Sequence, residues 1–156
     1  MKRFETKGSK ENQMTIGVAV IGAGMAGRGH AAAYRAATSL YGSDLPEVKL
    51  VSIGDVNAQF GEAAAKRFGF ERHDADWRTI ADDPNIHAVS VVVANHLHRE
   101  IVEGLLAAGK HVLCEKPLSD TLDDARAMVK AAAEAKSIAR IGLTFLRNPA
   151  IEQFSS

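Results

Sequence analysis

The sequence predicts an α/β fold, a doubly wound parallel sheet of about six strands in a single domain. Short β-branched apolar segments alternate along the chain with longer segments rich in alanine and other helix formers. The apolar segments are continuous, as in strands that are covered on both faces. Parallel strands need crossover connections, and crossover helices cover the faces of such a sheet. This alternation therefore predicts a Rossmann-type architecture.

The individual elements follow from the same patterns. The expected strands are Thr15–Ile21, Val48–Ile53, Glu71–His73, Ala88–Val93, His111–Cys114 and Ile138–Phe145. The expected helices are Arg28–Thr38, Ala58–Phe68, a helical turn at Asp76–Ala81, Leu97–Ala108 and Leu122–Ala135. Ser39–Glu47 contains glycine, serine, aspartate and proline and is expected to be a loop. Gly69 and Gly109 are expected to end the helices before them, and Trp77 to fill space beneath the third crossover.

The composition narrows the class of protein. The chain has 156 residues, enough for one domain, and its 19 basic residues balance 19 acidic ones, which gives no field to attract nucleic acid or an anionic membrane. No apolar segment has the length that a bilayer requires. The single cysteine, Cys114, excludes an internal disulfide and fits a cytoplasmic protein. Residues 1–13 are charged throughout, unlike a secretory signal, and are expected to form a disordered leader before a dinucleotide-binding domain over 14–156.

A glycine-rich segment after the first strand predicts a dinucleotide site. Gly22-Ala23-Gly24-Met25-Ala26-Gly27 has the GxGxxG spacing between a strand and a helix. The first glycine permits the turn, the second allows backbone to approach a pyrophosphate, and the third permits close packing of helix and strand. The start of the helix supplies unpaired N–H groups for the anion, including those of Met25 and Ala26. The alternative is a tight turn that binds no ligand.

Asp55 directly follows the second strand and favours NAD as the cofactor, with NADP as the alternative. A carboxylate at this position can accept both hydroxyls of the adenosine ribose and would repel a 2′-phosphate. No lysine or arginine lies between Asp55 and Lys66. Asp55 lies 28 residues beyond Gly27, and the Ser39–Glu47 loop accounts for the long interval. Asp55 is also a candidate to cap the second helix, a role compatible with ribose binding.

Lys116 follows the fifth strand and is the candidate catalytic residue. Ligand sites in such folds lie at the carboxyl ends of the strands, so its ammonium would face the cofactor crevice. There it could hydrogen-bond a substrate hydroxyl or a ribose, with a pKa lowered from its ordinary value of about 10.4. The alternative is a solvated lysine in a turn.

From Thr15 to Ile151 the chain resembles the Gfo/Idh/MocA oxidoreductase family. The resemblance rests on the glycine segment, on Asp55, and on two further strings, Asn95-His96-Leu97-His98 and Gly109-Lys110-His111-Val112-Leu113-Cys114-Glu115-Lys116-Pro117-Leu118. It also includes Arg147-Asn148-Pro149-Ala150. The second string is much more specific than the glycine segment.

The resemblance implies a function as well as a fold. Family members bind NAD or NADP in an N-terminal Rossmann domain and oxidise or reduce sugars, polyols and related compounds. It implies that Asn95, His96, Glu115, Lys116 and Pro117 lie at the cofactor crevice and that the Lys116–Pro117 bond is cis. Val93-Ala94 departs from the Thr-Pro that the family often has before the asparagine.

The resemblance also predicts a missing part. Family enzymes continue into a second α/β domain that binds the substrate, carries catalytic Asp and His residues, and commonly forms the oligomer interface. We therefore expect NAD(H) binding with negligible turnover by this chain alone, a small-molecule substrate only with a C-terminal domain, and a homo-oligomer through Ile138–Phe154. The alternative function is a non-catalytic nucleotide-binding or interaction module. A methyltransferase-like fold is disfavoured by Glu115-Lys116-Pro117.

Three other signals carry less weight. His96 and His98 with Cys114 lack a second ligand pair at zinc-site spacing, so no metal site is predicted. Cys114 is expected to be a buried strand thiol. His30 lies on the first helix near the glycine segment, where packing and function are equally plausible roles.

Overall fold

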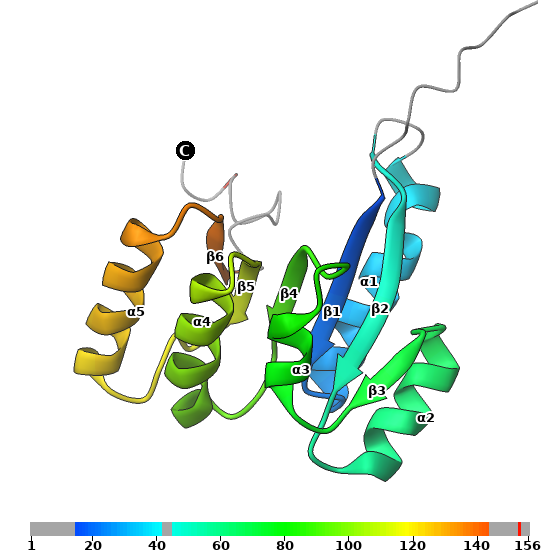
Figure 1. Cartoon of the computed structure of the whole chain (residues 1–156), viewed down its shortest axis with the longest axis horizontal. Helices are drawn as coiled ribbons and strands as arrows, with labels where there is room; N and C mark the ends of the chain where they lie inside the picture. The colour runs from blue at the N-terminus through cyan, green and yellow to red at the C-terminus, as the bar shows by residue number, and fades with distance from the viewer. Residues whose placement is uncertain (1–14, 42–44, 144–152, 154–156) are drawn as a thin grey trace, which may run out of the picture.

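The computed structural model describes residues 15–41, 45–143 and 153, and six parallel strands form one sheet there (Figure 1). The strands are β1 (Ile16–Ile21), β2 (Val48–Gly54), β3 (Arg72–Asp74), β4 (Ala88–Val91), β5 (His111–Glu115) and β6 (Ala139–Gly142). Their order across the sheet is β3-β2-β1-β4-β5-β6. The chain builds outward from β1 to one edge and then from the other side of β1 to the opposite edge. The predicted doubly wound fold is confirmed.

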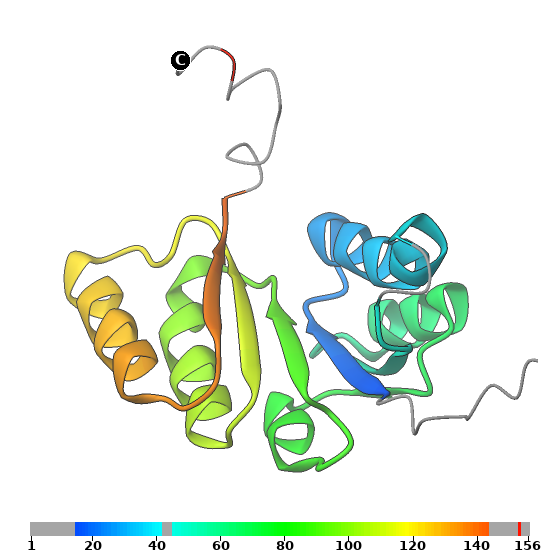
Figure 2. The ribbon, with the colours of Figure 1, turned by 90° about the horizontal axis from the view of Figure 1, so that it is seen from above.

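Helices cover the two faces of the sheet (Figure 2). α1 (Met25–Tyr41) and α2 (Ala58–Phe68) lie on one face, and α3 (Trp77–Asp82), α4 (His98–Ala107) and α5 (Leu122–Glu134) lie on the other. A short 3₁₀ helix, η2 (Asn95–Leu97), precedes α4. Among the described residues, no helix has the length and apolar character needed to cross a membrane.

Strand β1 shows why the apolar segments are continuous. Val20 packs into the core on the α1 and α2 side, with Ile53 and Ala31, whereas Ala19 and Ile21 pack into the core on the other side. All five of these side chains are at most 5% exposed. Because successive side chains of a strand point to opposite faces, a strand covered on both sides is apolar at most positions.

The ends of α2 fall where the sequence predicts them. Asn57 precedes the helix, and its side chain accepts a hydrogen bond from the N–H of Phe60 at 3.2 Å. Gly69 ends the helix in the left-handed conformation, with φ of +78°. Gly109 has φ of +77° just after α4, as predicted for a residue that ends a helix.

Four predicted boundaries are wrong by two residues or more, namely both ends of α1, the end of β4, and the end of β6, which lies at Gly142 and not at Phe145. Helix α1 begins at Met25 and continues to Tyr41, whereas the predicted helix runs from Arg28 to Thr38. The helix is therefore three residues longer at each end. Gly27 and Gly29 have low helix propensity and concealed its start. Strand β4 ends at Val91, two residues early, because Val92 and Val93 lead out of the sheet toward η2. The predicted leader, residues 1–13, and most of Ile138–Phe154 beyond residue 143 lie outside the described residues.

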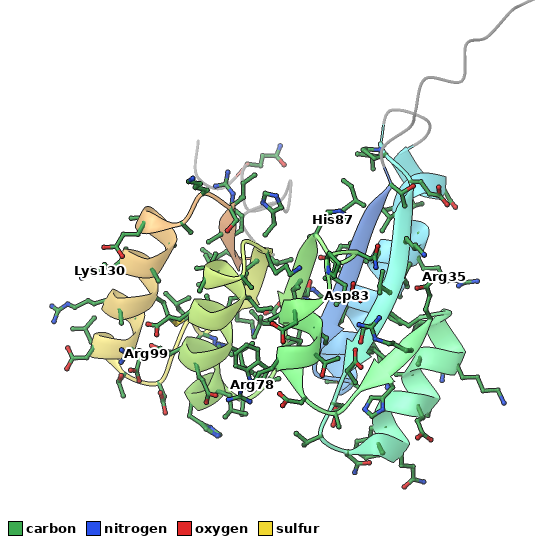
Figure 3. The ribbon with its side chains drawn as sticks, in the orientation of Figure 1. Arg35, Arg78, Asp83, His87, Arg99 and Lys130 are labelled. Atoms are coloured by element: carbon green, nitrogen blue, oxygen red, sulfur yellow. The ribbon has the colours of Figure 1, made fainter. Side chains whose placement is uncertain are left out.

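Contacts between the helices of one layer are partly ionic. Arg78 on α3 pairs with Glu100 on α4 at 2.6 Å, and Arg99 on α4 pairs with Asp124 on α5 at 2.8 Å (Figure 3). These pairs are largely solvent-exposed and contribute little stability each. Trp77 also joins α3 to α4, because Gly104 leaves room for its indole ring.

Candidate functional site

The strand order reverses between β1 and β4, and this is where an open α/β sheet binds its ligand. The segments that leave the carboxyl ends of the two strands diverge to opposite faces. The glycine segment leads from β1 into α1, and residues 92–94 lead from β4 into η2 and α4. The site is therefore built from these two segments and their neighbours.

The three glycines of the segment have different surroundings. A Cβ on Gly22, whose φ is +107°, would overlap the carbonyl oxygen of Val92, and a Cβ on Gly27 would overlap the carbonyl oxygen of Gly22. A Cβ on Gly24 would meet no atom within 4 Å. Gly22 and Gly27 are thus required by the fold, whereas Gly24 borders open space.

The start of α1 offers donors to an anion in that space. The first helical bond that closes there runs from the N–H of Arg28 to the carbonyl of Gly24 at 3.0 Å. The N–H groups of Met25, Ala26 and Gly27 therefore have no acceptor within the helix. No acidic residue lies in the first turn of α1, and Met25 is 92% exposed. A pyrophosphate fits this geometry and charge.

Asp55 lies beside the glycine segment. One carboxylate oxygen accepts the N–H of Ala23 at 2.8 Å, and the other accepts the N–H of Asn57 at 2.8 Å. A carboxylate has about four acceptor positions, so capacity remains for ribose hydroxyls. The suggestion that Asp55 caps the second helix is wrong, because Asn57 is the capping residue. Asp55 instead ties the glycine segment to the start of α2.

A cavity of about 420 Å³ opens beside Gly24 and Asp55. The residues that line it include two acids, Asp55 and Glu100, and no lysine or arginine. A 2′-phosphate would thus meet a carboxylate and no basic partner among the lining residues, which favours NAD over NADP. The lining residues are Ile21, Gly22, Gly24, Gly54, Asp55, Val56, Ala75, Trp77, Val92, Val93, Ala94, Leu97, Glu100 and Ile101.

Several of these lining residues were not predicted as site residues. Val92 and Val93 are predicted to be strand residues, and Val93-Ala94 departs from the family pattern. Their position at the carboxyl end of a buried strand indicates a place near the ligand site. Trp77 and Ile101 come from the crossover helices, and no local pattern distinguishes them from core residues. They reach the cavity only through the packing of α3 and α4 on the sheet.

Asn95 and His96 lie on η2. They stand in the sequence between two lining residues, Ala94 and Leu97, but do not line the cavity themselves. Asn95 is half-buried and His96 is exposed. His98 begins α4, one residue later than predicted, and is 1% exposed. Its Nε2 lies 3.1 Å from the carbonyl oxygen of Val93 and its Nδ1 lies 3.1 Å from that of Leu118. His98 therefore joins the segment after β4 to the segment after β5.

The segment Glu115-Lys116-Pro117 begins with the last residue of β5, and its Lys116–Pro117 bond is cis, as the resemblance implied. The side chain of Lys116 is exposed and has no hydrogen-bond or ion-pair partner among the described residues. The Glu115 side chain is 17% exposed, and its oxygen lies 3.0 Å from Nε2 of His30 on α1. This contact brings the segment beside the first turns of α1, on the side of the glycine segment.

The ionisation of Glu115 and Cys114 follows from their surroundings. Burial acts to raise the pKa of Glu115, but the hydrogen bonds from His30 and from the N–H of Lys116, with their charges, more than offset it and hold this pKa below its ordinary value. Burial and the charge of Glu115 raise the pKa of the Cys114 thiol to about 12. Cys114 is 2% exposed, which confirms a buried strand thiol. Among the described residues, no three His, Cys, Asp or Glu side chains are grouped as metal ligands.

The family model for the oxidoreductase family with an NAD-binding Rossmann fold matches residues 16–143. The chain belongs to the Gfo/Idh/MocA oxidoreductase family. Levoglucosan dehydrogenase of Pseudarthrobacter phenanthrenivorans is 38% identical to it over 138 residues, which are 87% of this chain and 35% of that protein. The 1,5-anhydro-D-fructose reductase of Ensifer adhaerens is 45% identical over 87 residues, 56% of this chain and 26% of the reductase.

Solved structures of Gfo/Idh/MocA proteins share the fold. A levoglucosan dehydrogenase in complex with NADH and levoglucosan superposes with a TM-score of 0.84 at 36% identity, over 88% of this chain and 37% of the dehydrogenase. An oxidoreductase domain protein from Kribbella flavida gives 0.83 at 36% identity, over 89% of this chain and 38% of that one. The chain thus spans about a third of the length of the relatives that it matches. The matched part is their NAD-binding Rossmann domain.

Proposed function

We propose that this chain is the NAD(H)-binding part of an oxidoreductase that acts on a sugar, a polyol or a related hydroxyl or carbonyl compound. One observation carries the proposal: Gly24 borders open space at the carboxyl edge of the sheet, between unpaired N–H groups of α1 and the carboxylate of Asp55. Related proteins of the family are named as dehydrogenases or reductases of levoglucosan, 1,5-anhydro-D-fructose and inositol.

In this proposal each segment has a distinct task. The N–H groups at the start of α1 bind the pyrophosphate, and Asp55 accepts the hydroxyls of the adenosine ribose. Asn95, His96 and the segment Glu115-Lys116-Pro117 face the nicotinamide half. NAD, when bound, supplies hydride acceptance or donation.

Lys116 is the proposed catalytic residue of this chain. Its exposed ammonium can donate a hydrogen bond to a substrate oxygen and stabilise negative charge that develops there. The chain spans about a third of its relatives' length, so the proposed substrate site includes residues of a C-terminal α/β domain. A non-catalytic nucleotide-binding module is the alternative, and it differs in having no turnover in any assembly.

The proposal is tested by titrating NADH into the full chain and following nicotinamide fluorescence, with NADPH in parallel. We expect saturable binding of NADH and weaker binding of NADPH. If neither NADH nor NADPH binds, both the oxidoreductase and the nucleotide-binding module are refuted. Oxidation of levoglucosan or inositol, with and without a family C-terminal domain added in trans, then distinguishes these two.

We also propose that the protein self-associates through the region around β6. Ile138, Ile141 and Leu143 are 58%, 37% and 45% exposed, and adjoining apolar residues at a sheet edge favour contact with a partner. Light scattering coupled to size-exclusion chromatography would give a mass of two or more chains. A monomer at high concentration would refute this part of the proposal.

A further inference from the structure

A network of polar side chains runs beneath α1 to Glu115 at the end of β5. The Tyr34 hydroxyl lies 2.9 Å from Oγ of Ser90 on β4, and the same Oγ lies 3.1 Å from Nδ1 of His30. Nε2 of His30 lies 3.0 Å from one oxygen of Glu115. The other oxygen of Glu115 accepts the backbone N–H of Lys116 at 3.0 Å. Three elements, α1, β4 and β5, are connected in this way.

The direction of the hydrogen bonds can be worked out from the Glu115 end. Glu115 accepts the backbone N–H of Lys116 and its pKa lies below the ordinary value, so it is ionised at neutral pH. An ionised carboxylate only accepts, so Nε2 of His30 carries a proton and donates it. In neutral imidazole Nδ1 is then an acceptor, and the Ser90 hydroxyl donates to it. Tyr34 in turn donates to Ser90, so each donor of this network has an acceptor.

The burial of these groups makes each bond consequential. Ser90 is fully buried, and the side chains of His30 and Glu115 are each 17% exposed. A buried polar group that loses its partner costs more than a solvated one, because water cannot replace the bond. Glu115 therefore has a strong preference for the one orientation in which both of its oxygens are bonded.

Strand β6 makes room for this orientation. A Cβ on Gly142 would lie 2.8 Å from the Glu115 oxygen that bonds His30. Any larger residue at this position would displace the carboxylate. Gly142 on β6 thus leaves the space that this oxygen occupies, and His30 on α1 holds the oxygen there through a hydrogen bond.

We infer that His30 is a positioning residue for Lys116: through Glu115 it fixes the backbone of the Glu115-Lys116-Pro117 segment, and thereby the reach of the Lys116 ammonium toward the nicotinamide half of the dinucleotide. This inference rests on the proposed function. It assigns to His30 a role in ligand binding although His30 does not line the cavity beside Gly24.

The first test measures the contact itself, without any ligand. In the full chain labelled with ¹⁵N, the amide of Lys116 reports the ionisation of the carboxylate that it binds. The titratable groups around that carboxylate are His30 and Tyr34 on α1, Cys114 on β5 and Lys116. We expect His30→Ala to move the midpoint of the Lys116 amide titration to higher pH, because the carboxylate of Glu115 loses a hydrogen-bond donor.

His30→Gln is the rescue variant, since a glutamine amide can donate to Glu115 and should keep the midpoint near that of the natural protein. His87→Gln is the matched control. His87 precedes β4 at the opposite end of the sheet, where its Nδ1 accepts the N–H of Gly17 at 2.9 Å (Figure 3). It should leave the midpoint unchanged. Tyr34→Phe, which removes the far end of the network, should move the midpoint in the same direction as His30→Ala but less.

The second test measures NADH binding by the same variants. We expect His30→Ala to weaken binding about tenfold, in line with the loss of one hydrogen bond to a charged group, and His30→Gln and His87→Gln to stay within about twofold of the natural protein. Equal midpoints in His30→Ala and His30→Gln, or equal NADH affinities, would overturn the inference. If the natural protein binds no NADH, the proposed function fails and the positioning role with it, while the amide midpoint still judges the His30–Glu115 contact. Circular dichroism shows whether His30→Ala is folded. If this variant is unfolded, Tyr34→Phe takes its place in both tests.

Discussion

The different surroundings of the glycines lead to a sharp prediction about alanine substitutions at Gly24, Gly27 and Gly29. A methyl group at Gly27 would overlap the carbonyl oxygen of Gly22, and backbone must shift to remove the overlap. We expect Gly27→Ala to lower the free energy of unfolding by about 3 kcal/mol. For a domain of this size, that lowers Tm by about 6 to 12 °C.

A methyl group at Gly24 meets nothing within 4 Å. Gly24→Ala should therefore change the free energy of unfolding by less than about 1 kcal/mol, which is the scale of a substitution at a helix start. The same methyl group would occupy the space through which backbone approaches the pyrophosphate. We expect it to weaken NADH binding by about tenfold to a hundredfold, the equivalent of about 1 to 3 kcal/mol of steric cost.

Gly29 supplies the control. It is exposed on α1, and a Cβ there also meets no atom within 4 Å. Gly29→Ala should raise the free energy of unfolding by about 0.5 to 1 kcal/mol through helix propensity and leave NADH binding unchanged. Thermal unfolding followed by circular dichroism and NADH fluorescence titration measure the two quantities separately. Unchanged NADH affinity in Gly24→Ala would refute the placement of the diphosphate against this glycine.

Three further predictions concern charge and ionisation. Asp55→Asn keeps an oxygen acceptor for Ala23 but removes the charge that would repel a 2′-phosphate, so the ratio of NADH to NADPH affinity should fall about tenfold; an unchanged ratio would count against a ribose role. Cys114, with its pKa raised to about 12 by burial and by the charge of Glu115, should react with a thiol reagent about a hundredfold or more slowly in the folded protein than in urea, and fast reaction in the folded protein would contradict its burial. The backbone N–H of Asn85 and the guanidinium of Arg72 hold the pKa of Asp83 below its ordinary value against the effect of burial. A carboxyl whose pKa is lower in the folded state stabilises it above the unfolded pKa, about 3.9, and this contribution is lost as pH falls through the folded pKa. Urea unfolding should therefore show Asp83→Asn less stable than the natural protein at pH 7 and equally stable near pH 2; equal stability at both pH values would refute this linkage.

Local patterns predicted the elements of the fold well because each depends on few neighbours. Apolar segments predicted the strands other than β3, which is short and polar, and Gly69 ended α2 as its position implied. The predicted start of α1 was too late because Gly27 has a low helix propensity. Gly27 is nevertheless required for the close approach to Gly22, so tertiary packing outweighed propensity. The predicted role of Asp55 as a helix cap is wrong, because the side chain of Asn57, two residues later, accepts the N–H of Phe60 in the first turn of α2.

The candidate site was only partly readable from the sequence. Gly22, Gly24, Gly27 and Asp55 carry a spacing that follows from the chemistry of a dinucleotide. The pairing of His30 with Glu115 could not be predicted, because the two residues are 85 positions apart and no periodicity links them. The same holds for Trp77 and Ile101 at the cavity.

The sequence by itself determined the class of fold, the family and the nucleotide-binding segment, because period-two and helical patterning and a glycine spacing are local properties of a chain. Only the tertiary structure decided which glycine borders open space, which oxygen of Glu115 is bonded and which crossover residues reach the cavity. These depend on how α1, α3 and α4 pack on the sheet, and packing brings together atoms that no sequence interval relates.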